Sequence, residues 1–347
     1  AVTGAGLTIV RCAHLWTCSE GPIDPSRRGL ARGMELGLFS IVHWINALVA
    51  VRREPNTMRA IVGSTHSQAV APGEPVAGER AALVGAVKSA RREHPWLDLR
   101  HIDLSPSDGD AAAHLIAELV SASDETELAY RGGHRLAARL ERVDLPGGGP
   151  SAAGFRQGGL YLISGGLGGI GKELGSRLLR EFGARLLIVG RTPVTRDGSS
   201  PGEVARSLAD LEAAGPDRVH YAAIDVVDEP ALRAAVDDAR RHWQTDLAGI
   251  LHLAGNYHEG PVVSETPERL AAIVSARIQG GRSLAALLDR PDQFFVAASS
   301  GAAWFGGAGL TGYAAASRYL EGLVAELRAT QPFRSLVVGW SVWRDLG

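Results

Sequence analysis

The chain has 347 residues and a formal net charge of −2, and its 36 basic and 38 acidic side chains are interspersed. This charge pattern gives no electrostatic footprint for nucleic acid or for an anionic membrane, so we expect neither partner. The length is sufficient for two domains of ordinary size, each with its own buried core.

The two cysteines, Cys12 and Cys18, have neither the spacing of a zinc site nor a disulfide framework around them. We therefore expect buried thiols and a cytoplasmic protein. The most apolar stretch, residues 36–51, is too short and mixed for a membrane span, so we expect a packed helix with His43 in the core. Because the sequence starts at Ala1 and not at Met, we expect a piece of a larger polypeptide.

The first half, residues 1–150, alternates strand-like and helix-like segments, which indicates an α/β domain with a doubly wound sheet. Strands are expected at residues 7–16, 58–64, 98–104 and 127–130, the last followed by a basic stretch, and helices at residues 34–51, 79–93 and 110–121. Residues 14–21, after the first strand, contain no glycine fingerprint for a phosphate. This half is therefore expected to be a nucleotide-binding fold without a nucleotide.

Residues 146–154 are rich in proline and glycine, and we place a domain boundary there, so that the second domain covers residues 151–347. Its strands are expected at residues 160–164, 185–189, 219–224, 248–253, 293–298 and 336–338, and its helices from about residue 170 and at residues 229–243, 267–288 and 311–328. This is a full Rossmann-type layout, whose ligand should lie at the carboxyl ends of the strands.

The strongest single signal is the glycine-rich run after the strand at residues 160–164. Its members are Ser164, Gly165, Gly166, Gly168, Gly169, Ile170 and Gly171. Glycines at this spacing let a dinucleotide pyrophosphate touch the backbone, and the helix that follows directs its positive end at the phosphates. In a chain with 43 glycines the pattern alone would be weak. Here it opens a βαβ unit whose next strand, residues 185–189, lies where the fingerprint requires it.

Five further positions at strand ends are candidates for the cofactor site. Arg191 follows the second strand, where a cation suits the 2′-phosphate of NADPH, although a surface arginine is the alternative. Asp225 and Val226 follow the third strand, and Asp225 could accept a hydrogen bond from adenine or simply form a turn or helix cap. Ala254 and Gly255 follow the fourth strand and are small enough for close backbone approach, or for close packing alone.

Ser300 ends a buried-strand pattern, and Tyr313 follows it by thirteen residues on the next predicted helix. A tyrosine beside a nicotinamide can protonate the oxygen of a carbonyl that receives hydride, while a serine hydroxyl aligns the same oxygen. The phenol has an ordinary pKa of about 10, so a nearby fixed cation is needed to lower it. Alone, such residues usually serve packing and capping; downstream of a cofactor fingerprint they indicate carbonyl reduction.

These motifs resemble the short-chain dehydrogenase/reductase superfamily, and the chain as a whole is similar to the ketoreductase domain of a modular (type I) polyketide synthase. The resemblance rests on residues 14–16, 130–135, 161–171, 252–255, 266–270, 299–300, 312–316 and 339–343. It implies a degenerate, cofactor-free first Rossmann subdomain that serves as scaffold, and a second subdomain that binds NADPH. It also implies a β-keto thioester carried on the phosphopantetheine arm of an acyl carrier protein, with other synthase domains as neighbours. A keto group α to the thioester stays open.

By the same resemblance, Ser300 and Tyr313 are the catalytic serine and tyrosine, but two positions depart from the family pattern. Arg277 stands where the family has lysine, and Ser317 stands where it has asparagine. A guanidinium keeps the positive charge but does not titrate and binds as a fork. Two hypotheses follow: an active reductase that uses Arg277, or a reductase-like structural module that has lost turnover. An epimerase or dehydratase of the extended class would want lysine at position 317.

The pattern at the substrate side is mixed. One stereochemical class of the family carries Leu-Asp-Asp after the Ala-Gly pair, and this chain has Tyr257, His258 and Glu259 there. The other class carries a tryptophan between the serine and the tyrosine; Trp304 lies one residue earlier than expected, with Phe305 in the expected place. His258 and Glu259 are candidates for substrate contact, or else solvated loop residues. Trp304 and Phe305 are either substrate-guiding residues or a lid or core pair.

Overall fold

The computed structural model describes residues 9–19, 23–24, 26–52, 57–144, 154–194 and 202–343. The chain forms two compact units around two mainly parallel sheets, which confirms an α/β fold with two Rossmann-like subdomains. The first unit comprises residues 1–140, 256–274 and 299–329, and the second comprises residues 141–255, 275–298 and 330–347. The predicted domain boundary near residue 150 stays a prediction. The two compact units are divided differently, since the first unit also contains segments from the second half of the chain.

The first unit contains a five-stranded sheet whose strands follow chain order. They are β1 (Arg11–Thr17), β2 (Met58–Thr65), β3 (Leu97–Leu104), β4 (Glu127–Arg131) and β5 (His134–Ala137). The first four are parallel, and β5 runs antiparallel to β4 across a turn of Gly132 and Gly133. Both glycines have positive φ, 55° and 78°, as a two-residue type I′ hairpin requires. The basic stretch after β4 is thus a hairpin strand, which the sequence analysis did not predict.

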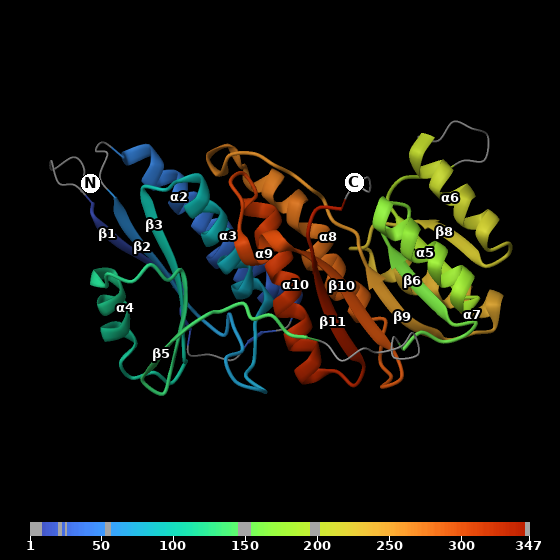
Figure 1. The fold of residues 1–347 in the computed structure, drawn as a ribbon, viewed down its shortest axis with the longest axis horizontal. Helices are drawn as coiled ribbons and strands as arrows, with labels where there is room; N and C mark the ends of the chain where they lie inside the picture. Colours follow the sequence, from blue (N-terminus) through green and yellow to red (C-terminus); the bar gives the residue numbers. More distant parts are fainter. Residues whose placement is uncertain are drawn as a thin grey trace. The chain divides into compact units, whose positions relative to one another are not determined.

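Helices cover both faces of this sheet (Figure 1). The helices of the first unit are α1 (Arg27–Met34), α2 (Ser40–Val51), α3 (Gly78–Glu93), α4 (Ala111–Val120), α9 (Gly301–Phe305) and α10 (Thr311–Thr330). His14 of β1 and its β2 neighbour Val62 face α2, where His14 Nε2 lies 2.7 Å from Ser40 Oγ. Ile61 points to the other face and packs with Leu115 of α4. Among the described strands the order does not reverse, so this sheet lacks the switch point at which nucleotides bind.

The helix predicted at residues 34–51 begins earlier than expected. It starts at Arg27 and contains a π-helical turn at Glu35–Phe39. Ser26 caps the start, because its Oγ accepts a hydrogen bond of 3.0 Å from Gly29 N–H. The apolar periodicity does not reveal this start, because Gly29 interrupts it. A Cβ on Gly29 would lie only 2.2 Å from the Asp24 backbone oxygen.

The apolar face of this helical segment faces the core. Leu38, Ile41 and Ile45 are fully buried, whereas His43, predicted to lie in the core, is exposed. Arg27–Val51 is the one segment in the described parts of the chain that is long and apolar enough to cross a membrane by length and composition. A core helix passes the same test, and the burial of this apolar face is what a core helix requires.

The first strand starts at Arg11, and residue 7, where it was predicted to start, lies outside the described residues. Cys12 and Cys18 are free, half-buried thiols. Burial raises the pKa of each thiol to about 11, so both stay protonated at neutral pH. The sequence predicted buried thiols, and the structure shows thiols that are free but only half-buried.

The second sheet has six strands in the order β11-β10-β9-β6-β7-β8. They are β6 (Leu160–Ser164), β7 (Arg185–Gly190), β8 (Val219–Ala223), β9 (Leu247–His252), β10 (Phe294–Ser300) and β11 (Arg334–Trp340). Every predicted strand is found, with ends within two residues of the prediction. The order reverses between β6 and β9, which is the topological switch point of a Rossmann fold. The carboxyl ends of these two strands are therefore where a dinucleotide is expected.

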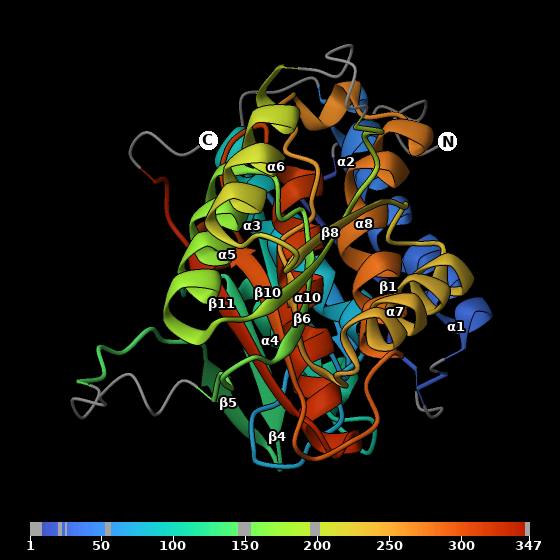
Figure 2. The same cartoon turned by 90° about the vertical axis from the view of Figure 1, so that its right-hand side faces the viewer.

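Helices α5 (Gly169–Phe182) and α6 (Gly202–Ala214) lie on one side of this sheet, and α7 (Glu229–Trp243) lies on the other (Figure 2). The long helix α8 (Pro267–Ala285) follows β9. The core under α5 and α6 joins Leu178 and Leu211 to Ile163 and Ile188 of the sheet. Helix α6 and the short helix α9 were not predicted.

Candidate active site

The glycine run forms a tight turn at the end of β6. Gly165 has a φ of 71°, and a Cβ on it would lie 2.9 Å from the backbone nitrogen of Ala254. A Cβ on Gly171 would lie 2.6 Å from the Gly165 oxygen and 2.6 Å from the Gly166 Cα. Both neighbours are backbone and cannot move aside cheaply. These positions therefore require glycine for the turn itself. Contact of the turn with a pyrophosphate stays a prediction.

The outer side of the same turn is open. Gly168 is exposed and is the N-cap of α5, and it supplies no side chain to cap the helix. A Cβ on Gly168 would meet only the Gly165 oxygen, at 3.5 Å. The first-turn N–H groups at Gly169 and Ile170 belong to a helix end that favours an anion. A crowded inner side, an open outer side and a helix N-terminus at the switch point fit a dinucleotide pyrophosphate.

A buried histidine joins β6 to β9 beneath this turn. Ser164 Oγ lies 2.7 Å from His252 Nδ1, and Ala254 N–H donates to Ser164 Oγ at 3.3 Å. Burial, with the positive charge of Arg277, lowers the pKa of His252 to about 3, so the imidazole is neutral. The sequence analysis assigned His252 no role, although a histidine at the end of a buried strand was a signal for one.

Arg277 lies on α8 and is buried against the segment that follows β9. A Cβ on Gly255 would lie 2.8 Å from Arg277 Nε, so Gly255 leaves room for the guanidinium. The side chain of Arg277 is 7% exposed. A cation is therefore held after the carboxyl end of β9, next to Gly255, which was predicted to approach the cofactor.

The remaining cofactor candidates lie in different environments. Arg191 is exposed directly after β7. Asp225 is exposed and accepts a hydrogen bond of 3.2 Å from Val227 N–H, which is the turn role considered as its alternative. Val226 is buried, and a Cβ on Gly280 of α8 would lie 2.5 Å from its Cγ2. Their contacts with a cofactor stay predictions.

Ser300 and Tyr313 both belong to the first unit. Ser300 ends β10 and caps α9, because Ala302 N–H donates to its Oγ at 3.2 Å. Tyr313 lies in the first turn of α10 and is half-buried. Its ring meets that of Tyr257 edge-on, with centroids 5.2 Å apart. Ser300 thus fills the capping role considered as its alternative, and its hydroxyl proton can still be donated.

Ser317 lies one turn after the tyrosine and is fully buried. Its Oγ donates a hydrogen bond of 2.8 Å to the Tyr313 carbonyl. Ser299 Oγ lies 3.2 Å from the Ser317 carbonyl and 3.1 Å from the Glu321 carboxylate. The Ser317 hydroxyl is thus engaged with its own helix, where the longer amide of asparagine would reach further.

The loop candidates have partners within the protein. His258 Nε2 lies 3.3 Å from the buried carboxylate of Glu265, and Glu259 accepts a hydrogen bond of 2.9 Å from the Tyr257 hydroxyl. Both belong to the first unit, as Tyr313 does. Their contact with substrate stays a prediction.

Trp304 and Phe305 do not form a pair. Trp304 is half-buried, with Lys88 Nζ 4.5 Å from its ring centre, whereas the side chain of Phe305 is 55% exposed. The two neighbouring aromatics therefore face different surroundings.

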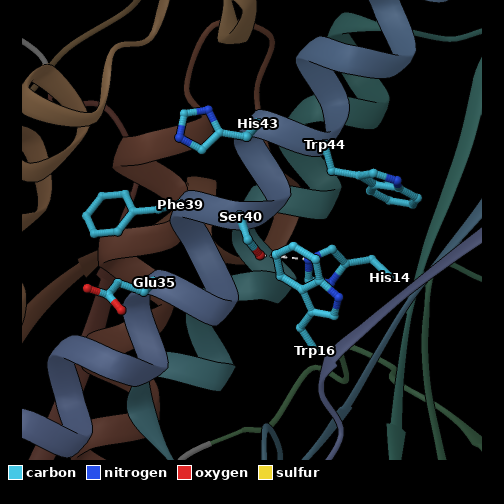
Figure 3. A pocket seen from close by; sticks show the side chains of 7 residues that line it. All are labelled: His14, Trp16, Glu35, Phe39, Ser40, His43 and Trp44. Carbon is cyan, nitrogen blue, oxygen red and sulfur yellow. Dashed lines mark hydrogen bonds between the residues drawn. The ribbon is translucent and has the colours of Figure 1, made fainter.

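A pocket of about 500 Å³ opens between β1 and α2 in the first unit (Figure 3). It is lined by His14, Trp16, Glu35, Phe39, Ser40, His43 and Trp44. In Figure 3 Trp16 and Trp44 flank His14, and their ring centres lie 5.3 Å and 5.5 Å from the imidazole. None of the predicted site residues lines this pocket.

Comparison with known families and proteins matches both halves of the chain. Residues 159–345 match the model described as "KR domain", and residues 39–140 match "Polyketide synthase extender module SpnB, Rossmann fold domain". Polyketide synthase GfsA of Streptomyces halstedii is 32% identical over 356 residues, covering 100% of this chain and 4% of that protein. Pikromycin polyketide synthase component PikAIII of Streptomyces venezuelae is 32% identical over 312 residues, covering 88% of this chain and 19% of that protein. The chain thus spans a small part of these relatives.

Solved structures give the same result. The structure titled "Structure of A-type Ketoreductases from Modular Polyketide Synthase" has a TM-score of 0.76 and 32% identity, and the match covers 92% of this chain and 64% of that one. A structure of a "keto acid-selecting NRPS module" has a TM-score of 0.83 and 22% identity, covering 97% of this chain and 29% of that one. The second likeness concerns the fold alone.

Proposed function

The chain belongs to the ketoreductase domains of modular type I polyketide synthases, and from this premise we propose that it reduces a β-keto acyl thioester to the β-hydroxy acyl thioester with NADPH. The substrate is carried on the phosphopantetheine arm of an acyl carrier protein. Neighbouring synthase domains deliver and remove it, in keeping with the multidomain relatives. The observation that carries the proposal is the glycine cradle at the reversal of strand order between β6 and β9.

The second unit supplies the cofactor site. Backbone N–H groups of the glycine run would bind the pyrophosphate, and Arg191 would pair with the 2′-phosphate that distinguishes NADPH from NADH. Asp225 and Val226 would hold the adenine. When bound, NADPH supplies the hydride that reaches the carbonyl carbon.

Ser300 and Tyr313 act on the carbonyl oxygen. With hydride added to the carbonyl carbon, the C–O π electrons would move to oxygen, and the Tyr313 hydroxyl would give that oxygen its proton. Ser300 donates a second hydrogen bond to the same oxygen and fixes its direction. This is supported by the bond from Ala302 N–H to Ser300 Oγ, which orients the hydroxyl and leaves its own proton to be donated.

Arg277 takes the role of the fixed cation. A cation about 4 Å from a tyrosinate is worth roughly 4 kcal/mol at an effective dielectric constant of 20. The guanidinium supplies this charge but cannot pass on a proton, because it does not titrate. In the proposed reaction the proton lost by Tyr313 would have to be replaced from solvent. The Ser317 hydroxyl, bonded to the Tyr313 carbonyl, is shorter than the family's asparagine.

A second function is favoured by two observations. Arg277 replaces the family's lysine, and the Ser317 hydroxyl is bonded to the Tyr313 carbonyl. Both would suit a domain that keeps the ketoreductase fold as a structural module of the synthase and no longer turns over.

Turnover decides between the two functions. NADPH absorbance is followed with a β-keto thioester of N-acetylcysteamine, and NADPH binding is measured separately by titration. For an active domain, Tyr313→Phe should lower kcat at least about 100-fold without changing the Kd for NADPH. Tyr130→Phe is the matched control, because it removes a phenol hydroxyl that bonds Glu118 in the first unit and takes no part in the reaction. NADPH binding with no turnover by the parent chain would establish the structural module instead.

A further inference from the structure

The Trp304 indole covers a buried cluster of charged side chains in the first unit. Lys88 Nζ lies 4.5 Å from the centre of its ring, and the guanidinium carbon of Arg318 lies 5.6 Å from the same centre. Lys88 Nζ also donates a hydrogen bond of 2.9 Å to the Trp304 carbonyl. Two cations therefore face one indole, and one of them also holds its backbone.

These cations are fixed from below by carboxylates. Glu127 of β4 is 4% exposed and forms ion pairs with both Lys88 and Arg318, the latter at 2.5 Å. Arg318 forms a second ion pair of 2.6 Å with Glu321. The cluster is thus paired charge for charge and holds the two cations in place beneath the indole.

The use of lysine and not arginine at position 88 indicates a specific role for this side chain. Of the 36 basic residues only two are lysines, Lys88 and Lys172. An ammonium is compact and can direct its three protons to separate acceptors, whereas a guanidinium is a planar fork. Lys88 uses this property, because its Nζ forms an ion pair with Glu127, a hydrogen bond to the Trp304 carbonyl and a cation–π contact with the indole.

The same face of α3 holds the residues that follow Trp304. Arg92 Nε donates to the Phe305 carbonyl at 2.7 Å, and Ser89 Oγ accepts from Gly307 N–H at 3.3 Å. Figure 1 shows α3 beside α9, and the two helices are in contact. A Cβ on Gly306 would lie 2.7 Å from the Lys88 carbonyl carbon, so the two backbones touch.

Glu93 extends this attachment to a second segment. Its carboxylate accepts from Gly309 N–H at 3.2 Å and from Val262 N–H at 2.8 Å. The last two turns of α3 therefore bind four backbone groups between residues 304 and 309, directly before the helix that carries Tyr313. Within this segment Phe305 is 55% exposed, although its backbone carbonyl is held by Arg92.

We propose that Trp304 is an anchor and not a substrate contact, that Lys88 is the positioning residue that holds it, and that Phe305 is thereby presented as the aromatic side chain that meets the acyl chain. The proposal deepens the proposed function and rests on it only for the acyl chain. It assigns to α3, a helix of the first unit, a specific part in substrate selection.

The anchor is tested without any turnover. Hydrogen exchange of the peptide that spans residues 301–310 is measured by mass spectrometry in the parent chain and in Lys88→Met, which keeps the apolar stem and removes the charge. The peptide should exchange at least about tenfold faster in Lys88→Met. Lys172→Met, the only other lysine and paired with Asp210 in the second unit, should leave this peptide unchanged. Unchanged exchange in Lys88→Met would overturn the anchor.

A second variant distinguishes loss of this attachment from unfolding of the whole chain. Glu93→Gln retains the side chain's size and its carbonyl oxygen but weakens the bonds to Gly309 and Val262, so it should accelerate exchange in the same peptide by a smaller factor. Thermal unfolding followed by circular dichroism shows whether each variant is folded. If both variants are folded and neither changes the exchange, the loop is not held by α3.

The presentation of Phe305 is tested on the product. With the N-acetylcysteamine thioester and NADPH, Phe305→Ala should raise KM and change the ratio of the two hydroxyl stereoisomers, with exchange at residues 301–310 unchanged. Trp304→Phe should change the stereoisomer ratio only as far as it accelerates hydrogen exchange at residues 301–310. A stereoisomer ratio that moves in Trp304→Phe while exchange does not would make Trp304 the substrate contact. If the parent chain does not turn over, the proposed function fails and the exchange result still decides the anchor.

Discussion

At position 277 a buried arginine stands where the family has lysine. Its guanidinium is accommodated because Gly255 has no Cβ, which would lie 2.8 Å from Nε. Charge is conserved, but an ammonium can exchange protons and make directed bonds that a guanidinium cannot. If the domain turns over as proposed, the residue type at 277 should therefore affect the rate more than the fold.

We expect Arg277→Lys to raise kcat/KM for the β-keto thioester by about 10- to 100-fold, because one misplaced group near the chemistry costs about that much. The Kd for NADPH should change by less than about threefold, since the charge is kept. Steady-state kinetics and a binding titration on the same preparation measure both. A lysine variant that is no faster than the parent would show that Arg277 is not what limits turnover.

The glycine cradle gives a second prediction at this scale. Gly171→Ala should lower the affinity for NADPH at least about tenfold, because its Cβ would lie 2.6 Å from backbone atoms that cannot yield. Gly175→Ala is the matched control one turn later on α5. There the Cβ would meet only side-chain carbons of Leu211 and Leu186, at 3.2 Å and 3.3 Å. Equal Kd values for the two variants would argue against a pyrophosphate on this turn.

The spacing in the sequence was sufficient to identify the glycines of the turn after β6, because a Cβ on Gly171, for example, would clash with the backbone of that same turn. It was not sufficient for Lys88, whose partner Trp304 lies 216 residues away. The capping role of Ser300 was also open from sequence, since the helix α9 that it caps has only five residues. Side chains whose role depends on a distant backbone group leave no periodic signal.

At the scale of elements, prediction succeeded where a local signal marked both ends. Helix α7 has the predicted bounds, Glu229–Trp243, because Asp228 caps it through a hydrogen bond of 3.0 Å from Ala231 N–H and Pro230 follows the cap. The edge strand β5 was missed although Gly132 and Gly133 are a strong hairpin signal. Only four residues follow that turn in strand form, so the alternation was too short to detect.

Helix α3 also packs against the helix that carries Tyr313, and this contact gives a third prediction. A Cβ on Gly85 would lie 2.4 Å from the Ala314 carbonyl oxygen. Gly85→Ala should therefore lower the free energy of unfolding by about 1–3 kcal/mol through overpacking. Gly109→Ala, where a Cβ would meet nothing within 4 Å, should change it by less than about 0.5 kcal/mol. Urea unfolding followed by circular dichroism compares them, and equal midpoints would disprove close α3–α10 packing.

At the scale of the whole molecule, each unit contains a fully buried neutral histidine. His101 lies in the first sheet, 2.9 Å from Ser64 Oγ, and His252 lies in the second sheet. Burial lowers the pKa of His101 to about 4 and, together with the charge of Arg277, that of His252 to about 3. Hydrophobic patterning located both strands, but the sequence could not show that either histidine is shut off from water.

These two histidines give a prediction about pH. Above pH 6.5 neither the folded nor the unfolded state protonates them, so they add no pH dependence. As pH falls from 6.5 toward 4, the unfolded chain takes up protons that the folded chain cannot, and the free energy of unfolding decreases. Each histidine should cost about 2 kcal/mol between pH 7.5 and pH 5 at ~1.4 kcal/mol per pH unit below 6.5.

Paired carboxylates such as Glu127 and Asp98, whose pKa values are lowered in the fold, lose their contribution only below the window between pH 6.5 and 5. The pKa values of His14 and His66 are also lowered by burial, so each histidine is isolated by comparing its variant with the parent. Urea unfolding at pH 7.5 and pH 5 is compared for the parent, His101→Gln and His252→Gln. Each variant should be less stable at pH 7.5 yet lose about 2 kcal/mol less than the parent on acidification. Because the glutamine cannot titrate, a pH dependence identical to that of the parent would mean that the histidine is already protonated or hydrated in the folded chain.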